Sequence, residues 1–347
     1  MQFLQITAMD LNNLINKIGI KQKEENKALN EYIENSNKNK EKLESLLSRF
    51  SEIITDNNAN ELFEEEMINE YYNYLSKNID DFNADSINIM NYQSICKIIG
   101  NDYSTNAKFG LFLSALINKN IKNGEEIQLN LPIPIHYLFY KLENAKAHVN
   151  IAGDYLGDRA KNSRIYAEEA MNCAGRDIEG CELHVKKAQN YLGNYAKNSE
   201  IYAGEAKDNA GLEMQGCELH INIAGDYLGD RAKNSRIYAE EARDYAGKDI
   251  EGCELHVKKV RDQFGTNAKN SEIYADEAGT QIQSLKILDL FPTGSGMKNS
   301  KLFIYKLGDS LDYECLTGNN KIYLGWKSYR KNTLGYMLNG VRIWRKR

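Results

Sequence analysis

The middle of the chain consists of eight consecutive segments of 18 residues, and this period constrains the fold more than any other feature. Each segment opens on asparagine or glycine, at Asn144, Asn162, Gly180, Asn198, Gly216, Asn234, Gly252 and Asn270. A further glycine recurs in the same frame, from Gly157 to Gly265. A short fixed period is typical of a solenoid, in which each repeat packs only against its neighbours.

Each repeat is predicted to contain one strand with a buried face. Apolar residues alternate with polar ones, as at Cys181, Leu183 and Val185, which is the period of a strand. Asparagine or glycine at the start of each coil suits a turn with positive φ. The repeats should therefore stack as parallel strands about 4.8 Å apart, forming a parallel β-helix about 40 Å long.

The predicted core rows alternate large and small residues with a period of 36. Val149, Ala167, Val185 and Ala203 follow this pattern, and the row from Ala160 to Ala268 follows it in the opposite phase. Such volume matching fills an interior to native density. We therefore expect the inside of the solenoid to be packed with side chains, without a ligand.

The chain divides into two predicted parts, which places it in the α+β class. Residues 1–122 form a helical head of three to five helices, because apolar residues recur there at helical spacing. The stretch 106–116 either caps the open end of the solenoid or belongs to the helical bundle. Residues 123–347 form the β-helix, with regular coils over 126–280, an irregular excursion at 285–298 and looser coils over 299–347.

Composition limits the function classes. The net charge of −5 argues against general binding of nucleic acid. The sequence shows no hydrophobic leader and no apolar run long enough for a membrane helix, so we expect a cytoplasmic protein that does not enter a membrane.

The cysteines are not expected to form disulfides or metal sites. Cys181, Cys217 and Cys253 share one buried row and lie two coils apart. That separation is about 9.6 Å, beyond the roughly 7 Å limit between the Cα atoms of a disulfide. We expect neither a metal nor another cofactor.

One outward row alternates histidine and tyrosine and is the candidate docking stripe. It comprises His148, Tyr166, His184, Tyr202, His220, Tyr238, His256 and Tyr274. Three interpretations remain open: an ordinary surface row, a docking surface for protein, or a strip that stacks on carbohydrate or nucleic acid. The docked protein could be the helical head, a second copy or another partner. Residues 150–170 recur unchanged at 222–242, so duplication alone could have copied the row.

Two segments resemble a known repeat. The run from Ala152 to Gly157 and the run from Asn162 to Ala167 are similar to the GXGXG β-helix, found in the large subunit of glutamate synthase and in the C subunit of formylmethanofuran dehydrogenase. The resemblance covers residues 124–347 and implies a right-handed β-helix that joins other protein parts. It also suggests an archaeal source. The first glycine of the motif is present only at Gly153, Gly225 and Gly279.

These observations predict a non-catalytic scaffold or protein-interaction protein that binds a protein partner or itself. The alternative is a β-helix enzyme or ligand-binding protein acting on a polymer such as a polysaccharide. Its site would lie at the irregular C-terminal coils, near Asp289, Asp309, Asp312 and Glu314.

Overall fold

The computed structural model describes residues 48, 50–52, 65–79, 102–278, 297–307, 320–324, 333–338 and 341–346. Helices α2 (Glu65–Asn78) and α4 (Tyr103–Asn120) precede the strands, and residues 48 and 50–52 are also helical. The strands are β1 (Glu126–Leu129), β2 (Lys146–Ala152), β3 (Arg164–Ala170), β4 (Glu182–Ala188), β5 (Glu200–Ala206), β6 (Glu218–Ala224), β7 (Arg236–Ala242), β8 (Glu254–Val260), β9 (Glu272–Ala278), β10 (Lys301–Leu307), β11 (Lys321–Leu324), β12 (Thr333–Leu338) and β13 (Val341–Lys346).

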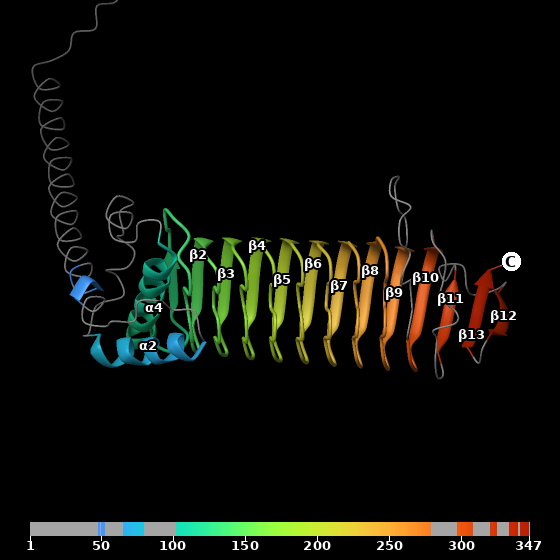
Figure 1. Ribbon diagram of the computed structural model, residues 1–347, viewed down its shortest axis with the longest axis horizontal. Helices are drawn as coiled ribbons and strands as arrows, with labels where there is room; N and C mark the ends of the chain where they lie inside the picture. Colours follow the sequence, from blue (N-terminus) through green and yellow to red (C-terminus); the bar gives the residue numbers. More distant parts are fainter. Residues whose placement is uncertain are drawn as a thin grey trace, which may run out of the picture.

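The strands form one sheet that follows the order of the chain from β1 to β11 and then continues with β13 and β12. From β2 to β9 each residue pairs in parallel with the residue 18 positions later, as Tyr166 does with His184. The coils stack in a single row with α4 across one end (Figure 1). The prediction of a parallel β-helix after a helical segment is confirmed.

The coils after β9 lose the 18-residue period. Lys301 pairs with Glu272, 29 positions earlier, and with Lys321, 20 positions later. Most of the predicted excursion, residues 285–296, lies outside the described residues, as do the four acidic residues of the alternative site. The antiparallel pairing of β12 with β13 was not predicted, because a sequence period does not report strand direction.

The alternation of asparagine and glycine at the coil starts has a steric cause. Asn162 and Gly180 both have positive φ, 48° and 63°, which confirms the predicted left-handed turn. A Cβ at Gly180 would lie 2.8 Å from Asn162 Oδ1, and a Cβ at Gly216 would lie 2.6 Å from Asn198 Oδ1. The amides of Asn162, Asn198 and Asn234 therefore occupy the space that a side chain at Gly180, Gly216 and Gly252 would need.

The predicted core rows are buried. Leu156, Ala174 and Leu192 have no exposed surface, and neither do Ala160 and Ile178.

The row of cysteine and serine is buried as well. Cys181, Cys217 and Cys253 are free thiols. Ser199 Oγ accepts the Cys181 N–H at 3.1 Å and donates to the Lys197 carbonyl at 2.8 Å. The serine hydroxyl thus links its coil to the preceding one by a hydrogen bond, without a disulfide.

The first coil is two residues longer than the regular ones. Ile127 and Leu129 are buried as predicted, but they pair with Ala147 and Val149, 20 positions later. Further along the same coil, Leu138 O accepts the N–H of Gly157, so the regular spacing between coils applies again from Leu138 onward. The two extra residues therefore lie between Leu129 and Leu138, where the sequence contains two prolines.

Helix α4 caps the first coil of the solenoid and also packs on α2, so the structure combines the two alternatives for residues 106–116. Ser114 Oγ donates to Tyr137 O at 2.9 Å and accepts from Tyr140 N–H at 3.1 Å. Asn118 donates to Tyr140 O at 2.9 Å. Backbone groups of the first coil have no preceding coil to bond with, and these side chains satisfy them instead.

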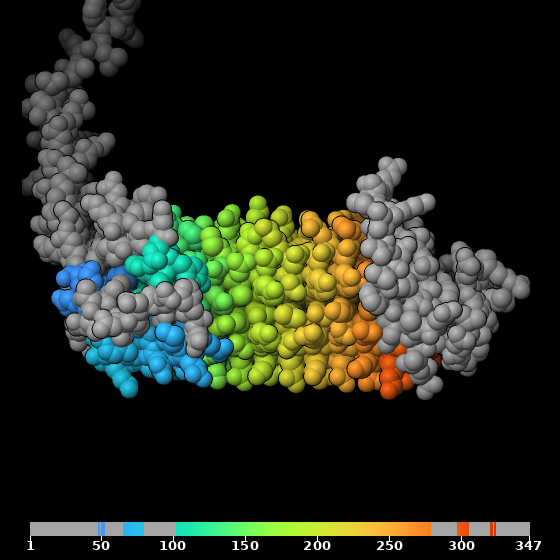
Figure 2. Space-filling view, viewed as in Figure 1, coloured from blue at the N-terminus to red at the C-terminus, as the bar shows by residue number. Residues whose placement is uncertain are grey.

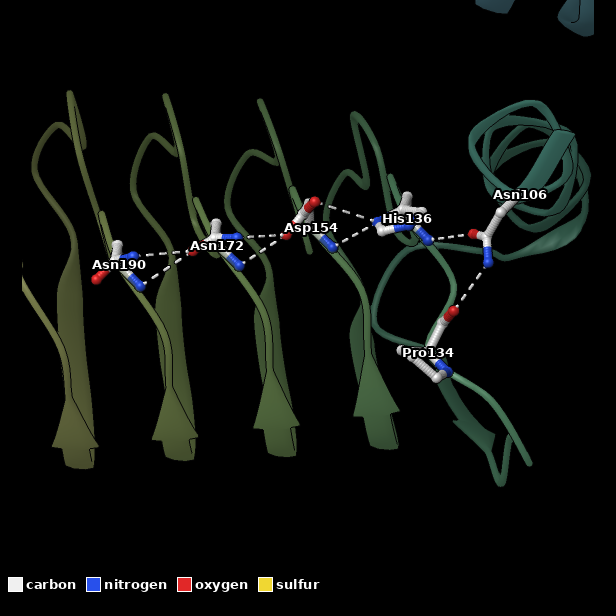
Figure 3. A network of polar contacts seen from close by, with 6 residues as sticks. All are labelled: Asn106, Pro134, His136, Asp154, Asn172 and Asn190. Atoms are coloured by element: carbon white, nitrogen blue, oxygen red, sulfur yellow. Dashed lines mark hydrogen bonds and ion pairs between the residues drawn. The ribbon is translucent and has the colours of Figure 1, made fainter. Parts of the chain in front are cut away.

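A polar ladder links this cap to the coils behind it (Figure 3). Asn106 donates to Pro134 O and accepts from His136 N–H, at 3.0 and 2.8 Å. His136 Nδ1 accepts from Asp154 N–H, and Asp154 Oδ1 accepts from Asn172 N–H, both at 2.9 Å. Burial lowers the pKa of His136, which favours the neutral ring that can accept this bond. The same step recurs at Asn190, Asp208, Asp226 and Asp244.

One ion pair is buried between the first regular coils. Arg176 Nε and Nη2 donate to Asp158 Oδ1 and Oδ2 at 3.0 and 2.6 Å, and the Asp158 side chain has no exposed surface. The Arg176 guanidinium also lies 4.6 Å from the centre of the Tyr155 ring. Burial raises the pKa of Asp158 to about 6, although the guanidinium favours the carboxylate.

Candidate docking surface

All eight histidines and tyrosines of the predicted stripe lie in one row, at the third residue of β2 to β9. Neighbouring rings are stacked, with centroids 4.3–5.2 Å apart and planes inclined by 6–19°. The eight side chains therefore form one continuous row along the sheet, with a spacing of one residue per coil.

The row continues beyond the residues that the sequence singled out. Phe303 stacks on Tyr274 and Tyr323 stacks on Phe303, each at 4.5 Å and 4°. Both follow coils with irregular spacing, and only their place two residues after the start of β10 and β11 could have identified them. We call the row from His148 to Tyr323 the aromatic stripe.

The stacking decides which part of each ring a partner can reach. From Tyr166 to His256 both faces of each ring are covered by its neighbours, so only the ring edges are open to a partner. Sugars and nucleobases bind aromatic side chains chiefly by stacking on an open ring face. The geometry thus favours a partner that contacts ring edges and the polar groups beside them, as a folded protein surface does.

Carboxylates run beside the stripe and fix the rings. Glu182, Glu218 and Glu254 lie 2.6–2.7 Å from the Nε2 atoms of His184, His220 and His256. Tyr202 donates its hydroxyl to Glu200 at 2.9 Å. These contacts fix the orientation of the rings, and the side chains of His184, His220 and His256 remain 35–37% exposed.

The same contacts set the charges beside the stripe. The hydrogen bond with His220 lowers the pKa of Glu218, and the hydrogen bond to Glu200 raises the pKa of Tyr202 to about 12. At neutral pH Glu218 is therefore ionised and Tyr202 is a protonated donor.

A shallow groove follows the stripe along the sheet. Two adjoining parts of it have volumes of about 730 and 360 Å³ and extend from Gln128 to Asp276. One wall is the aromatic stripe. The other wall is the fifth residue of each strand, which we call the fifth-position row: Asn150, Glu168, Lys186, Gly204, Asn222, Glu240, Lys258 and Asp276.

Charges of both signs border the groove. The fifth-position row carries Glu168, Lys186, Glu240 and Lys258, each with more than half of its side chain exposed. On the other side of the stripe lies the first residue of each strand, the first-position row: Lys146, Arg164, Glu182, Glu200, Glu218, Arg236, Glu254 and Glu272. In the space-filling view the coils from β2 to β9 lie side by side in chain order (Figure 2).

The described helices bind the end of the solenoid. The hydrogen bonds and ring contacts that α4 makes with the solenoid go to residues 134–141, and Glu65 of α2 pairs with Arg159 on a turn. Within the described residues, none of the polar or ring contacts of α2 and α4 involves the aromatic stripe. Docking of the helical head on the stripe therefore gains no support from these two helices.

Among the described residues no group of three or more histidine, cysteine, aspartate or glutamate side chains is placed to hold a metal ion. No helix of the described ranges is long and apolar enough to cross a membrane.

Comparison with protein-family models, with curated proteins and with solved structures finds no match.

Proposed function

We propose that this chain is a non-catalytic scaffold whose β-helix presents the aromatic stripe and its groove as a docking surface for protein. The observation that carries the proposal is the unbroken row of edge-exposed rings, flanked by a groove and by charges of both signs. Interfaces between proteins combine aromatic side chains with polar rims in this way.

The resemblance to the GXGXG β-helix supports the same proposal. In that family the repeat joins other protein parts, and residues 152–157 carry the likeness here. A scaffold of this kind would work in the cytoplasm, and an archaeal source would fit the family.

The stripe can be tested by photo-crosslinking in the native cell. Benzoylphenylalanine replaces either Tyr166, on the stripe, or Tyr195, an exposed tyrosine on a turn. We expect protein adducts at position 166 and few at position 195. Changing Tyr202, His220 and Tyr238 together to Ser should abolish the adducts at 166, because it removes the centre of the docking surface.

The circular dichroism spectrum of the triple variant should match that of the unchanged chain, because these side chains lie outside the core. Equal adduct yields at positions 166 and 195, or adducts at 166 that persist in the triple variant, would contradict the proposal.

A further inference from the structure

We infer that the partner of the aromatic stripe is a second copy of this chain, bound face to face in the antiparallel direction about a twofold axis between Tyr202 and His220. The inference rests on the proposed docking function and specifies its partner. It is drawn from the order of charges in the two rows that flank the stripe.

The symmetry fixes which strands meet. If the axis runs along the strand direction, each row lies opposite the same row of the second copy, and the two solenoids point in opposite directions. Strand β5 then faces β6, β4 faces β7 and β3 faces β8. The contact is isologous, so every pair of facing residues occurs twice.

The fifth-position row is complementary to itself in this register. Lys186 of β4 lies opposite Glu240 of β7, and Glu168 of β3 lies opposite Lys258 of β8. At the centre, Gly204 faces Asn222, which are both uncharged. No like charges meet between β3 and β8 in this row.

The first-position row is complementary in the same register, although its residues are different. Glu182 lies opposite Arg236, and Arg164 lies opposite Glu254. Further out, Lys146 of β2 faces Glu272 of β9. The exception is next to the axis, where Glu200 and Glu218 are both acidic and β5 meets β6.

A register shifted by half a coil loses this agreement. An axis through His220 would place Lys186 opposite Lys258 and Glu168 opposite Asp276. It would also bring histidine onto histidine, whereas the register between Tyr202 and His220 places every histidine of the stripe opposite a tyrosine. Electrostatic complementarity of this kind selects one register among many that are sterically similar.

The face is large enough for a stable pair. Eight strands spaced about 4.8 Å apart, each about 20 Å long, cover about 800 Å² per copy. That area is what a standard stable interface buries on each partner.

A charge swap tests the register, with sedimentation velocity of the full chain as the readout. Lys186→Glu alone would place glutamate opposite Glu240 twice, and Glu240→Lys alone would place lysine opposite Lys186 twice. We expect each single variant to weaken dimerisation roughly tenfold or more. The double variant restores both pairs and should dimerise nearly as well as the unchanged chain.

The double variant also separates folding from docking. Within one chain Lys186 pairs with Glu168 and Glu240 pairs with Lys258, so the double variant disrupts both internal pairs. Restored dimerisation could then arise only from contacts between copies. If the two copies packed in parallel instead, Lys186 would lie opposite Glu182 and Glu240 opposite Arg236. The double variant would then dimerise more weakly than either single variant.

Two results would overturn the inference: a double variant that is no better than the single ones, or an unchanged chain that stays monomeric at all concentrations. If the chain is monomeric and position 166 still gives protein adducts in cells, the proposed docking function stands with a different partner. If neither dimer nor adduct is found, both proposals fail.

Discussion

Replacing Arg176 by Met should lower the free energy of unfolding by about 3–5 kcal/mol at pH 7, the largest loss we expect from a change to a single polar side chain in the solenoid. The variant leaves the fully buried Asp158 carboxylate without the guanidinium that neutralises it. Chemical denaturation followed by circular dichroism measures the loss. The variant Arg176→Met with Asp158→Leu should recover most of it, because an apolar pair needs no counter-charge.

The loss should shrink in acid. Burial raises the pKa of Asp158 in the folded protein above its ordinary value, and removal of Arg176 should raise it further. The folded variant then binds a proton more tightly than the unfolded chain. The stability of the variant is therefore highest below the pKa that Asp158 has in the unfolded chain, near 4. It falls as the pH rises through the higher pKa that Asp158 has in the folded variant.

The matched control is Arg231→Met. Arg231 pairs with Glu213 at 3.1 Å, but both side chains are exposed, so we expect no measurable change in stability. A similar loss at both positions would show that the arginine side chains act through packing. A loss at Arg176 that does not depend on pH would contradict the assigned role of Asp158.

Replacing Gly110 by Ala should detach the cap. A Cβ at this position would lie 1.7 Å from the carbonyl oxygen of His136, which is backbone and cannot turn aside. Helix α4 must move away from the first coil, and the bonds from Asn106, Ser114 and Asn118 are then lost. We expect destabilisation of about 3 kcal/mol, with faster hydrogen exchange over β1 and residues 134–141.

Asn120→Ala on the same helix is the control, because among the described residues the Asn120 side chain bonds only to Leu116 O of its own helix. It should leave the exchange of the first coil unchanged. Unchanged exchange in the Gly110→Ala variant would mean that α4 is not the cap that the first coil requires.

The structural features that could be predicted from the sequence are those that the 18-residue period determines. A fixed period places each side chain in a row, and the rows give the core, the left-handed turns and the stripe. Asn162 and Tyr166 were assigned correctly for this reason, as were the buried rows through Leu156 and Ala160.

The remaining features depend on side-chain geometry that a period does not encode. Asp158 and Asp230 lie in identical sequence segments, yet the residue 18 positions later is Arg176 in one case and Lys248 in the other. The first aspartate forms a buried ion pair, whereas Asp230 Oδ1 is buried without a hydrogen-bond partner. The ladder from Asn106 likewise depends on which side-chain atom meets the next N–H.

The most direct test of the docking surface is hydroxyl-radical footprinting of the purified chain at concentrations below and above its self-association. Tyr166, Tyr202 and Tyr238 report on the aromatic stripe, and Tyr191 and Tyr195, each 39% exposed on the turns, serve as internal references. We predict that oxidation of the stripe tyrosines falls on association while oxidation of the two references stays constant. Equal oxidation of both groups at every concentration would show that the stripe remains open and would contradict self-docking through it.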